Sequence, residues 1–308
     1  MSIQKEIWLS DLSKVLYAKS PWLNICRNMD VYSSNRVVRI PQSTAIGASN
    51  ITKNKSVLPL TVGTNVQTEL TFNLDSFANQ PILVEDIDTV QLAFDKRADI
   101  LEQMSSVVSE RIGQESLINW SVPSSATTGC ASKIVKTNGE AFAGGAEDAE
   151  GNRSGITLSN LQTANAVLDK ENVSRENRWC IMSSDMYNNF LTTPDGLKTL
   201  NADYIKANLA KGAVNMIHGF NIMVTPTTPV YSSAFVKAAY GAATSSDNNQ
   251  SAICFGSKFV AKANHGNKVF YNENDAAYLG SYMSSEILFG SSRCYTNYIG
   301  IVNIVEQA

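Results

Sequence analysis

The chain has 308 residues with a formal net charge of −3, and 44% of its residues are hydrophobic and 17% charged. This length is enough to bury a sizeable core and suggests one large or two smaller domains. So low a share of charge favours a protein whose surface is covered by neighbours.

The first residues predict a short amphipathic helix. Apolar residues recur at helical spacing from Ile7 to Leu16, and Ser20-Pro21 ends the pattern because a residue before proline is pushed out of the helical region. The segment has no uninterrupted apolar run typical of a secretory signal, and no stretch reaches the roughly 20 apolar residues that cross a bilayer. We therefore expect no membrane partner and a protein that folds inside a cell.

The period changes to two between Asn35 and Asp75, which predicts a β-ribbon. One strand is expected around Val37–Pro41. A polar tip, Gln42–Ser56, separates it from two more strands, Val57–Val62 and Val66–Leu74. A two- or three-stranded ribbon is hard to stabilise alone. We therefore expect its apolar face to rest on a partner.

A short strand at Pro81–Ile87 is followed by the clearest element in the sequence, a long helix. Asp88 is a good N-cap with Gln91 in the capping-box position, and the pattern runs on to about Asn119. A helix of about 28 residues would be roughly 42 Å long. Its apolar stripe comprises Val90, Phe94, Leu101, Met104, Val108 and Ile112.

Residues 121–155 are rich in small and polar residues and predict loops that lead into a second, α/β unit. Its helices are expected at Leu158–Leu168, capped by Ser154 or Thr157, and from Ser184 to Leu191. Its strands are expected at Arg178–Met182, Gly219–Val224 and Ala252–Phe255, and further strands follow toward the end of the chain at Lys268–Tyr271, Glu286–Gly290 and Ile299–Val305.

The residues that would carry chemistry are sparse. The two histidines, His218 and His265, stand in no metal-binding or catalytic motif, and no phosphate-binding or nucleophile-elbow pattern is present. The run of Glu85, Asp86 and Asp88 is explained by the positive end of the helix that follows. The cysteines are widely spaced and predict reduced core thiols rather than a zinc site. We therefore expect no enzyme activity, no cofactor and no metal. The cysteines are Cys26, Cys130, Cys180, Cys254 and Cys294.

Charge is uneven along the chain. Residues 1–56 carry eight basic and three acidic side chains, a net of +5, while the remainder carries 17 basic and 25 acidic ones, a net of −8. A basic extension on an acidic body could reach an acidic neighbour, although ordinary surface scatter explains the same counts. The basic residues are too dilute to predict a DNA-binding patch.

The order of elements resembles the Hong Kong 97-like capsid fold of tailed double-stranded DNA phages, an α+β fold. Local phrases are similar as well: 72–75 through 88–91, 177–187, 219–225 and 289–293. The likeness covers about 35–305. The resemblance implies an N-terminal arm (1–34), an E-loop hairpin (35–76), a P-domain strand and spine helix (77–122), an A-domain (123–265) and a closing segment that returns to the P-domain (266–308).

The resemblance also implies a function, that of a major capsid protein. Pentamers and hexamers would tile an icosahedral head shell around double-stranded DNA, which is not bound sequence-specifically. Scaffolding, portal and decoration proteins would be further partners, and the shell would assemble in the cytoplasm of the bacterial host. Contacts between subunits would come from the E-loop and N-arm residues Val37, Val38, Ile40, Val57, Leu58, Leu60, Leu70, Phe72, Trp8 and Leu12.

Two alternatives stay open. An encapsulin-type nanocompartment shell would share the fold and differ in what it encloses. An adhesin or a hydrolase with an unrecognised site would be of a different class altogether, and a stable monomer would indicate it.

Overall fold

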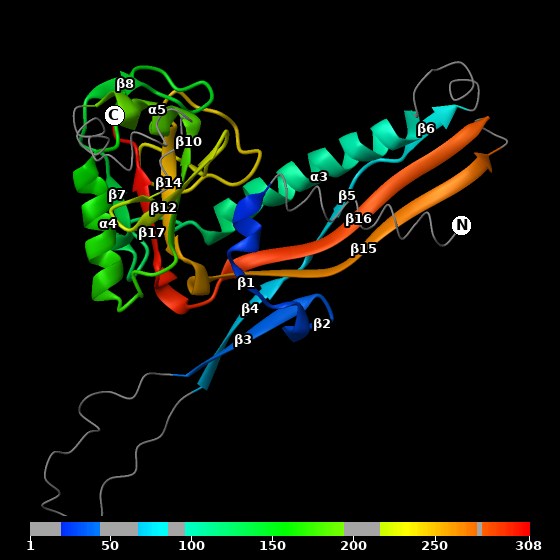
Figure 1. The fold of residues 1–308 in the computed structure, drawn as a ribbon, viewed down its shortest axis with the longest axis horizontal. Coiled ribbons are helices and arrows are strands. Elements are labelled where there is room, and N and C mark those ends of the chain that lie inside the picture. Colours follow the sequence, from blue (N-terminus) through cyan, green and yellow to red (C-terminus); the bar gives the residue numbers. More distant parts are fainter. Residues whose placement is uncertain (1–19, 44–66, 86–95, 194–215, 276–278) are drawn as a thin grey trace, which may run out of the picture.

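The computed structural model describes residues 20–43, 67–85, 96–193, 216–275 and 279–308. Within them the chain forms two large β-sheets, each covered by helix, as Figure 1 shows. The predicted mixture of helices and sheets is therefore confirmed. Single-turn helices occur at Pro21–Asn24 (η1), Asp30–Tyr32 (η2), Ala131–Lys133 (η4), Ser257–Phe259 (η5) and Thr296–Tyr298 (η6).

The first sheet is long and narrow and is built around an antiparallel pair, β15 and β16, with α3 lying along it (Figure 1). Residues on β16 alternate: Met283, Ser285, Ile287 and Phe289 are buried, while the residues between them are half-exposed. This alternation arises because one face of the sheet packs against the helix. The elements are β1 (Arg27–Asn28), β5 (Asp75–Ala78), β6 (Ile82–Glu85), β15 (Val260–Asp275), β16 (Gly280–Arg293) and α3 (Lys96–Trp120).

The described part of α3 has 25 residues, about 37 Å at 1.5 Å per residue. Met104, Val108 and Ile112 are buried, which confirms this part of the predicted stripe. Val90 and Phe94 lie outside the described residues, as does the side chain of Leu101.

The second sheet has the order β11-β12-β10-β14-β17-β7, with β13 also paired to β14. The pairs β10–β12 and β17–β7 are parallel, and β10–β14 and β14–β17 are antiparallel. All eight residues of β14 and all five of β17 are buried, since both strands are interior. The strands are β7 (Ile134–Lys136), β10 (Arg178–Ser183), β11 (Met216–Ile217), β12 (Phe220–Thr225), β13 (Val230–Tyr231), β14 (Asn249–Gly256) and β17 (Ile301–Val305).

Two helices accompany this sheet, and both begin at the residues that the sequence predicts. Thr157 caps α4 (Leu158–Lys170) in a capping box with Asn160, and Ser183 caps α5 (Ser184–Thr192) by accepting from the Met186 N–H at 3.1 Å. A separate two-stranded sheet, β8 (Ala141–Ala143) with β9 (Asn152–Ser154), lies in the segment expected to be loop.

A third sheet forms the base of the predicted ribbon. It consists of β2 (Ser33–Ser34), β3 (Val37–Ser43) and β4 (Gln67–Asn73), and the pairing of β3 with β4 runs from Val37↔Asn73 to Ser43↔Gln67. The predicted strand at 57–62 lies outside the described residues.

The end of the chain differs from the sequence-based expectation in two ways. The strand expected at Lys268–Tyr271 is part of the 16-residue strand β15, which continues through a register shift at Asn264–Asn267, where Gly266 has φ +90°. Residues 266–308 do not all return to the first sheet, because β17 lies between β14 and β7 in the second. The short apolar run of β17 suits any interior strand, so local pattern did not distinguish the two sheets.

Candidate assembly surfaces

The apolar face of the ribbon base packs on the chain's own body. Val38 and Ile40 are 0% and 6% exposed and cluster with Met29, Ala261 and Cys294. Leu70 and Phe72 are half-buried against the same cluster. The expectation that this face has no core of its own was therefore wrong. Met29, which precedes the ribbon, and Ala261 and Ala263 of β15 supply a partner that periodicity alone does not reveal.

The ribbon base crosses the long sheet at Gly290. A Cβ on this residue would lie 2.6 Å from the backbone oxygen of Asn73 and 2.8 Å from Leu74 Cδ2. Glycine is therefore required for the close approach of β4 to β16.

The segment that precedes the ribbon docks on α3. Trp22 and Leu23 are buried in the same cluster as Val108 and Ile112. Gly113 makes this possible, because a Cβ there would lie 2.1 Å from Ser20 Oγ. The other predicted contact residues of the N-terminal arm and ribbon, Trp8, Leu12, Val57, Leu58 and Leu60, lie outside the described residues.

The buried face of α3 also carries serines, which the apolar stripe did not include. Ser105, Ser109 and Ser116 are at most 1% exposed. The hydroxyls of Ser109 and Ser116 donate to carbonyls four residues earlier, at 2.5 and 2.7 Å, so neither is left unsatisfied. Their spacing of four and seven residues matches one helix face and could have indicated them.

Buried charges join the elements of the second unit. The ammonium of Lys133, a residue 2% exposed, donates to Glu171 Oε1 and to the Tyr298 carbonyl at 2.9 Å. Glu171 in turn accepts from the Gly300 N–H at 2.7 Å. The pair therefore holds η4, the end of α4 and the entry to β17 together.

A second such group is Arg178, which is 0% exposed and donates to Asp169 Oδ1 at 2.7 Å and to Asn165 Oδ1 at 2.7 Å. Hydrogen bonds from Arg175 and Arg178 lower the pKa of Asp169 to about 2. Arg178 also donates to the Val173 carbonyl at 2.6 Å, so it ties the end of α4 to the start of β10.

Each histidine lies at the surface, and His218 lines a hollow of about 450 Å³ together with Asp169 and Arg178. His218 is exposed in the turn between β11 and β12 at φ +47°, and His265 is exposed in the β15 irregularity with Nδ1 3.0 Å from Ser33 Oγ. In the described ranges, no group of three or more His, Cys, Asp or Glu side chains could hold a metal ion. No helix of the described part is long and apolar enough to cross a bilayer.

The cysteines are all buried and free, as predicted. Burial raises the pKa of Cys26 to about 12 and raises that of Cys254 as well, so these thiols are held in the neutral form. The Sγ atoms of Cys180 and Cys254 are 3.3 Å apart on paired strands in the core of the second sheet.

Two exposed apolar side chains stand out on η2. Val31 is 92% exposed and Tyr32 is 56% exposed, and we call this pair the apolar knob. The turn that carries it is held firmly, because Asp30 Oδ1 accepts from the Asn264 N–H at 2.6 Å and the Met29 N–H donates to Lys262 at 2.8 Å.

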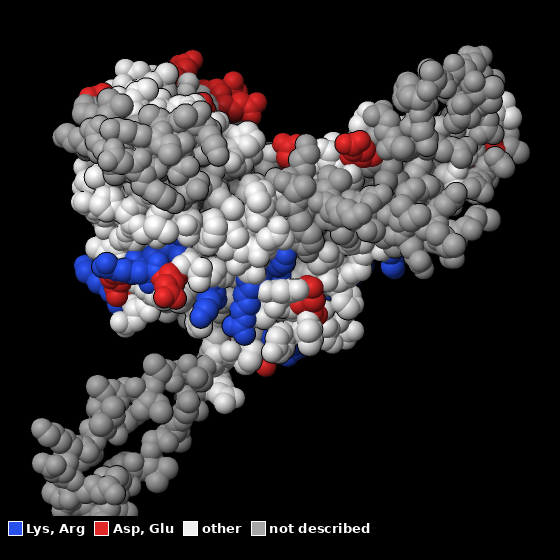
Figure 2. Space-filling view, in the orientation of Figure 1, with Lys and Arg blue, Asp and Glu red and all other residues white. Residues whose placement is uncertain are grey.

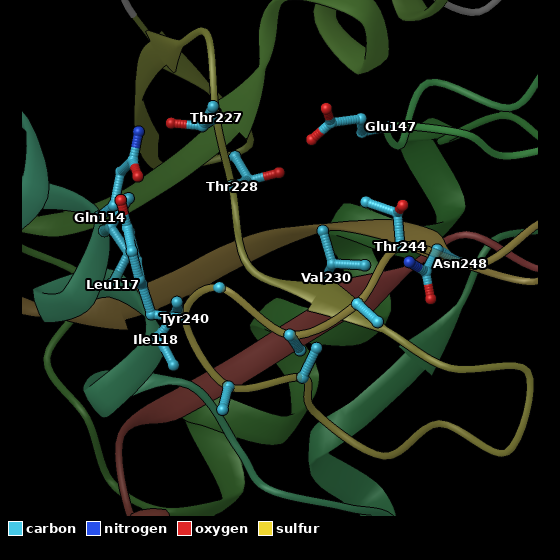
Figure 3. Close-up of a pocket in the computed structure, with 15 residues that line it drawn as sticks. Gln114, Leu117, Ile118, Glu147, Thr227, Thr228, Val230, Tyr240, Thr244 and Asn248 are labelled. Atoms are coloured by element: carbon cyan, nitrogen blue, oxygen red, sulfur yellow. The ribbon is translucent and has the colours of Figure 1, made fainter.

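A cavity of about 300 Å³ lies between the C-terminal half of α3 and the loops around β13, and we call it the helix–loop cavity (Figure 3). Leu117, Ile118 and Val230 form an apolar part of its wall, and Thr228 and Glu147 extend toward one another across it. A second hollow, of about 600 Å³, lies on the distal part of β15 and β16 beside Phe270 and Tyr282.

Charge is segregated over the face in Figure 2. Acidic side chains gather along the upper edge, and basic ones, with some acidic neighbours, along the lower edge. Exposed acidic residues of the 140–150 and 244–248 loops are Glu140, Glu147, Asp148, Glu150 and Asp247. Exposed basic residues near the ribbon base are Arg27, Arg36 and Arg39, of which Arg39 pairs with Glu69 at 3.3 Å.

Solved structures with a similar fold come from phages. The capsid structure of cyanophage P-SCSP1u matches with a TM-score of 0.65 and 16% identity, over 91% of this chain and 86% of that chain. The capsid of Ralstonia phage GP4 matches at 0.63 and 11%, over 92% and 87%. A chain of Mycobacterium phage Che8 matches at 0.60 and 14%, over 92% and 90%.

These likenesses span nearly the whole of each chain, so the fold is shared as a whole and not only in one sheet. At such identities they establish the fold. No family model matches the sequence, and no curated protein sequence matches it.

Proposed function

We propose that this chain is the major capsid protein of a tailed bacteriophage and forms the head shell from many copies of itself. The observation that carries the proposal is the fold that it shares, over about nine-tenths of both chains, with capsid structures of several phages. Its role is structural: buried polar groups such as Lys133 and Arg178 are engaged in holding elements together. The exposed loops instead offer neutral and acidic surface.

The finer layout follows the Hong Kong 97-like pattern in this proposal. The long sheet with α3 corresponds to the P-domain, the second sheet to the A-domain, and the β3–β4 ribbon to the base of the E-loop. Subunits form pentamers and hexamers, and the ribbon beyond its base, with Val57, Leu58 and Leu60, reaches a neighbouring subunit. The arm residues Trp8 and Leu12 make a second contact of this kind.

The shell encloses double-stranded DNA without reading its sequence, and it belongs to the virion capsid after assembly in the host cytoplasm. Scaffolding, portal and decoration proteins are the further partners. The acidic edge supports this view, because a negatively charged surface holds DNA without adhering to it.

Expression of the chain and electron microscopy of the purified product tests the proposal. Closed shells or ring-shaped capsomers are the expected result, and a monodisperse monomer at high concentration contradicts it. Shells that copurify with an enzyme, and hold no DNA when isolated from infected cells, would identify the nanocompartment alternative instead.

A further inference from the structure

The apolar knob is an ordered feature with no apolar partner of its own among the described residues. Val31 is 92% exposed, yet the backbone of η2 is fixed by the Tyr32 N–H, which donates to Met29 at 3.0 Å, and by Asp30. Isolated exposed apolar residues are common. Two adjacent ones held rigidly present a preorganised shape, which lowers the entropy cost of binding.

The helix–loop cavity has the complementary character. Its apolar residues, including Leu117 and Val230, are joined by a few polar groups, as in many binding sites. Thr228 Oγ1 is buried and has no hydrogen-bond partner in the described part of the chain. A ligand with an apolar body and a hydroxyl, such as a tyrosine side chain, would fill the cavity and satisfy this oxygen.

The charges around the two features have opposite signs. Arg27 and Arg36 are exposed and lie four residues from the knob along the chain, and Asp30 is the one acidic residue between them. Glu147 lines the cavity, and Asp148 accepts from the cavity residue Thr244. Complementary charge favours the correct encounter over others.

Two cations lie beside the cavity: Arg111, whose charge is compensated, and Lys237, whose Nζ donates to the carbonyl of the cavity residue Ile118 at 2.6 Å. Arg111 stacks on the Tyr240 ring at 3.3 Å and pairs with Glu115 at 3.2 Å. Glu110, which accepts from the cavity residue Gln114 at 3.1 Å, adds a further negative charge nearby.

We propose that the apolar knob of one copy docks in the helix–loop cavity of a second copy. This inference rests on the proposed function and identifies one contact within the shell. In Figure 1, β2 and the knob segment lie toward the lower edge, and the loops of the cavity lie toward the upper edge. Because the two surfaces differ, the contact is head-to-tail, and such contacts repeat into rings where the rotation between copies closes.

The hollow over β15 and β16 is the competing receptor, and charge separates the two. Among the residues that the structure describes, none with a charge lines that hollow, whose wall includes Phe270, Tyr282 and Met283. This hollow would accept an apolar side chain, but the arginines near the knob would find no opposite charge there and would add no electrostatic attraction. The helix–loop cavity is therefore the better partner.

Engineered cysteines test the contact directly, because the five native cysteines are buried. The full chain carrying both Tyr32→Cys and Thr228→Cys is treated with oxidised glutathione. When a disulfide forms between two subunits, the oxidised glutathione takes up the two electrons and the two thiol protons and becomes reduced glutathione. Non-reducing gels are expected to show a ladder that extends beyond the dimer, because each subunit is linked at both features. Each single variant should give no more than dimers. The matched control is Tyr32→Cys with Ser233→Cys, an exposed position outside the cavity.

Shells that form without a ladder would overturn the docking contact and leave the proposed function standing, whereas a chain that stays monomeric in electron microscopy would overturn both. A second measurement needs no cross-link. Tyr32→Ser should raise the protein concentration needed for shell formation by about tenfold, with circular dichroism unchanged, and Tyr32→Phe should raise it less because the ring is kept. Assembly of Tyr32→Ser at the parent concentration would refute the contact.

Discussion

Gly290→Ala tests the tightest packing in the molecule, the crossing of the ribbon base over β16. The added Cβ would lie 2.6 Å from the Asn73 oxygen, 2.8 Å from Leu74 Cδ2 and 3.2 Å from Phe72 Cε2. The nearest of these atoms belongs to the backbone, so it cannot swing aside as a flexible side chain would.

The backbone on both sides of that oxygen is held in place. Asn73 pairs with Val37 in the ribbon, the Leu74 N–H donates to the Arg36 carbonyl at 2.8 Å, and Asp75 pairs with Phe289 next to the glycine. Relief of the clash must therefore strain one of these pairings. Overpacking of this kind costs typically about 1–3 kcal/mol.

A smaller effect acts in the opposite direction. Replacing glycine by alanine restricts the unfolded chain and stabilises the folded state by roughly 0.4–1 kcal/mol where the backbone is compatible. Because the contact is with backbone, the steric cost is expected to dominate, and the net loss of unfolding free energy should be about 2 kcal/mol.

Urea unfolding of unassembled subunits, followed by circular dichroism, measures this loss. Ser284→Ala is the matched control, since Ser284 is a half-exposed residue on the same strand and should change the unfolding free energy by less than about 0.5 kcal/mol. If Gly290→Ala were as stable as the control, the crossing would be looser than described and the reasoning would fail.

Three further substitutions give distinct outcomes. Asn35 and Arg36 both have positive φ in the two-residue turn between β2 and β3, a conformation that glycine adopts more easily than arginine. Arg36→Gly should therefore raise the free energy of unfolding by about 0.5–1 kcal/mol in a urea titration. A decrease would contradict the turn assignment. Lys133→Met leaves Glu171 partly buried without its cation and should cost about 3–5 kcal/mol, visible as a lower thermal midpoint; an unchanged midpoint would show that the pair is dispensable. Burial raises the pKa of Glu306 to about 7, so the protonated carboxyl stabilises the folded chain at low pH, and this stabilisation is lost as pH rises toward 7. Glu306→Gln should therefore flatten the dependence of the free energy of unfolding on pH between about pH 5 and 7. An unaltered pH dependence would assign the titration to another group.

The local elements were predictable because their signals are local. The cap Thr157, the helix start at Ser184 and the stripe through Met104, Val108 and Ile112 follow from short-range spacing, and the structure confirms them. The partner of the ribbon was not predictable in this way. Val38 and Ile40 alternate as any half-buried strand does, and nothing in that pattern says whether the covering surface comes from the same chain or from another.

The long pair β15–β16 was missed for a related reason. Asn264, Gly266 and Asn267 are typical of turns, yet here they form an irregularity at which the strand continues. Whether such residues end a strand depends on the neighbouring strand, which lies outside the local window. The apolar knob and the helix–loop cavity also depend on segments far apart in the sequence, so they became visible only in the folded chain.

The position of β17 has a consequence for how the subunit is made. This strand follows all the other described strands along the chain, yet it occupies an interior slot between β14 and β7. Until the ribosome has released it, both neighbours expose unpaired edges that could associate with other nascent chains. Completion of the second sheet therefore waits until Val305 has been synthesised, and a product truncated before Ile301 would be prone to aggregate.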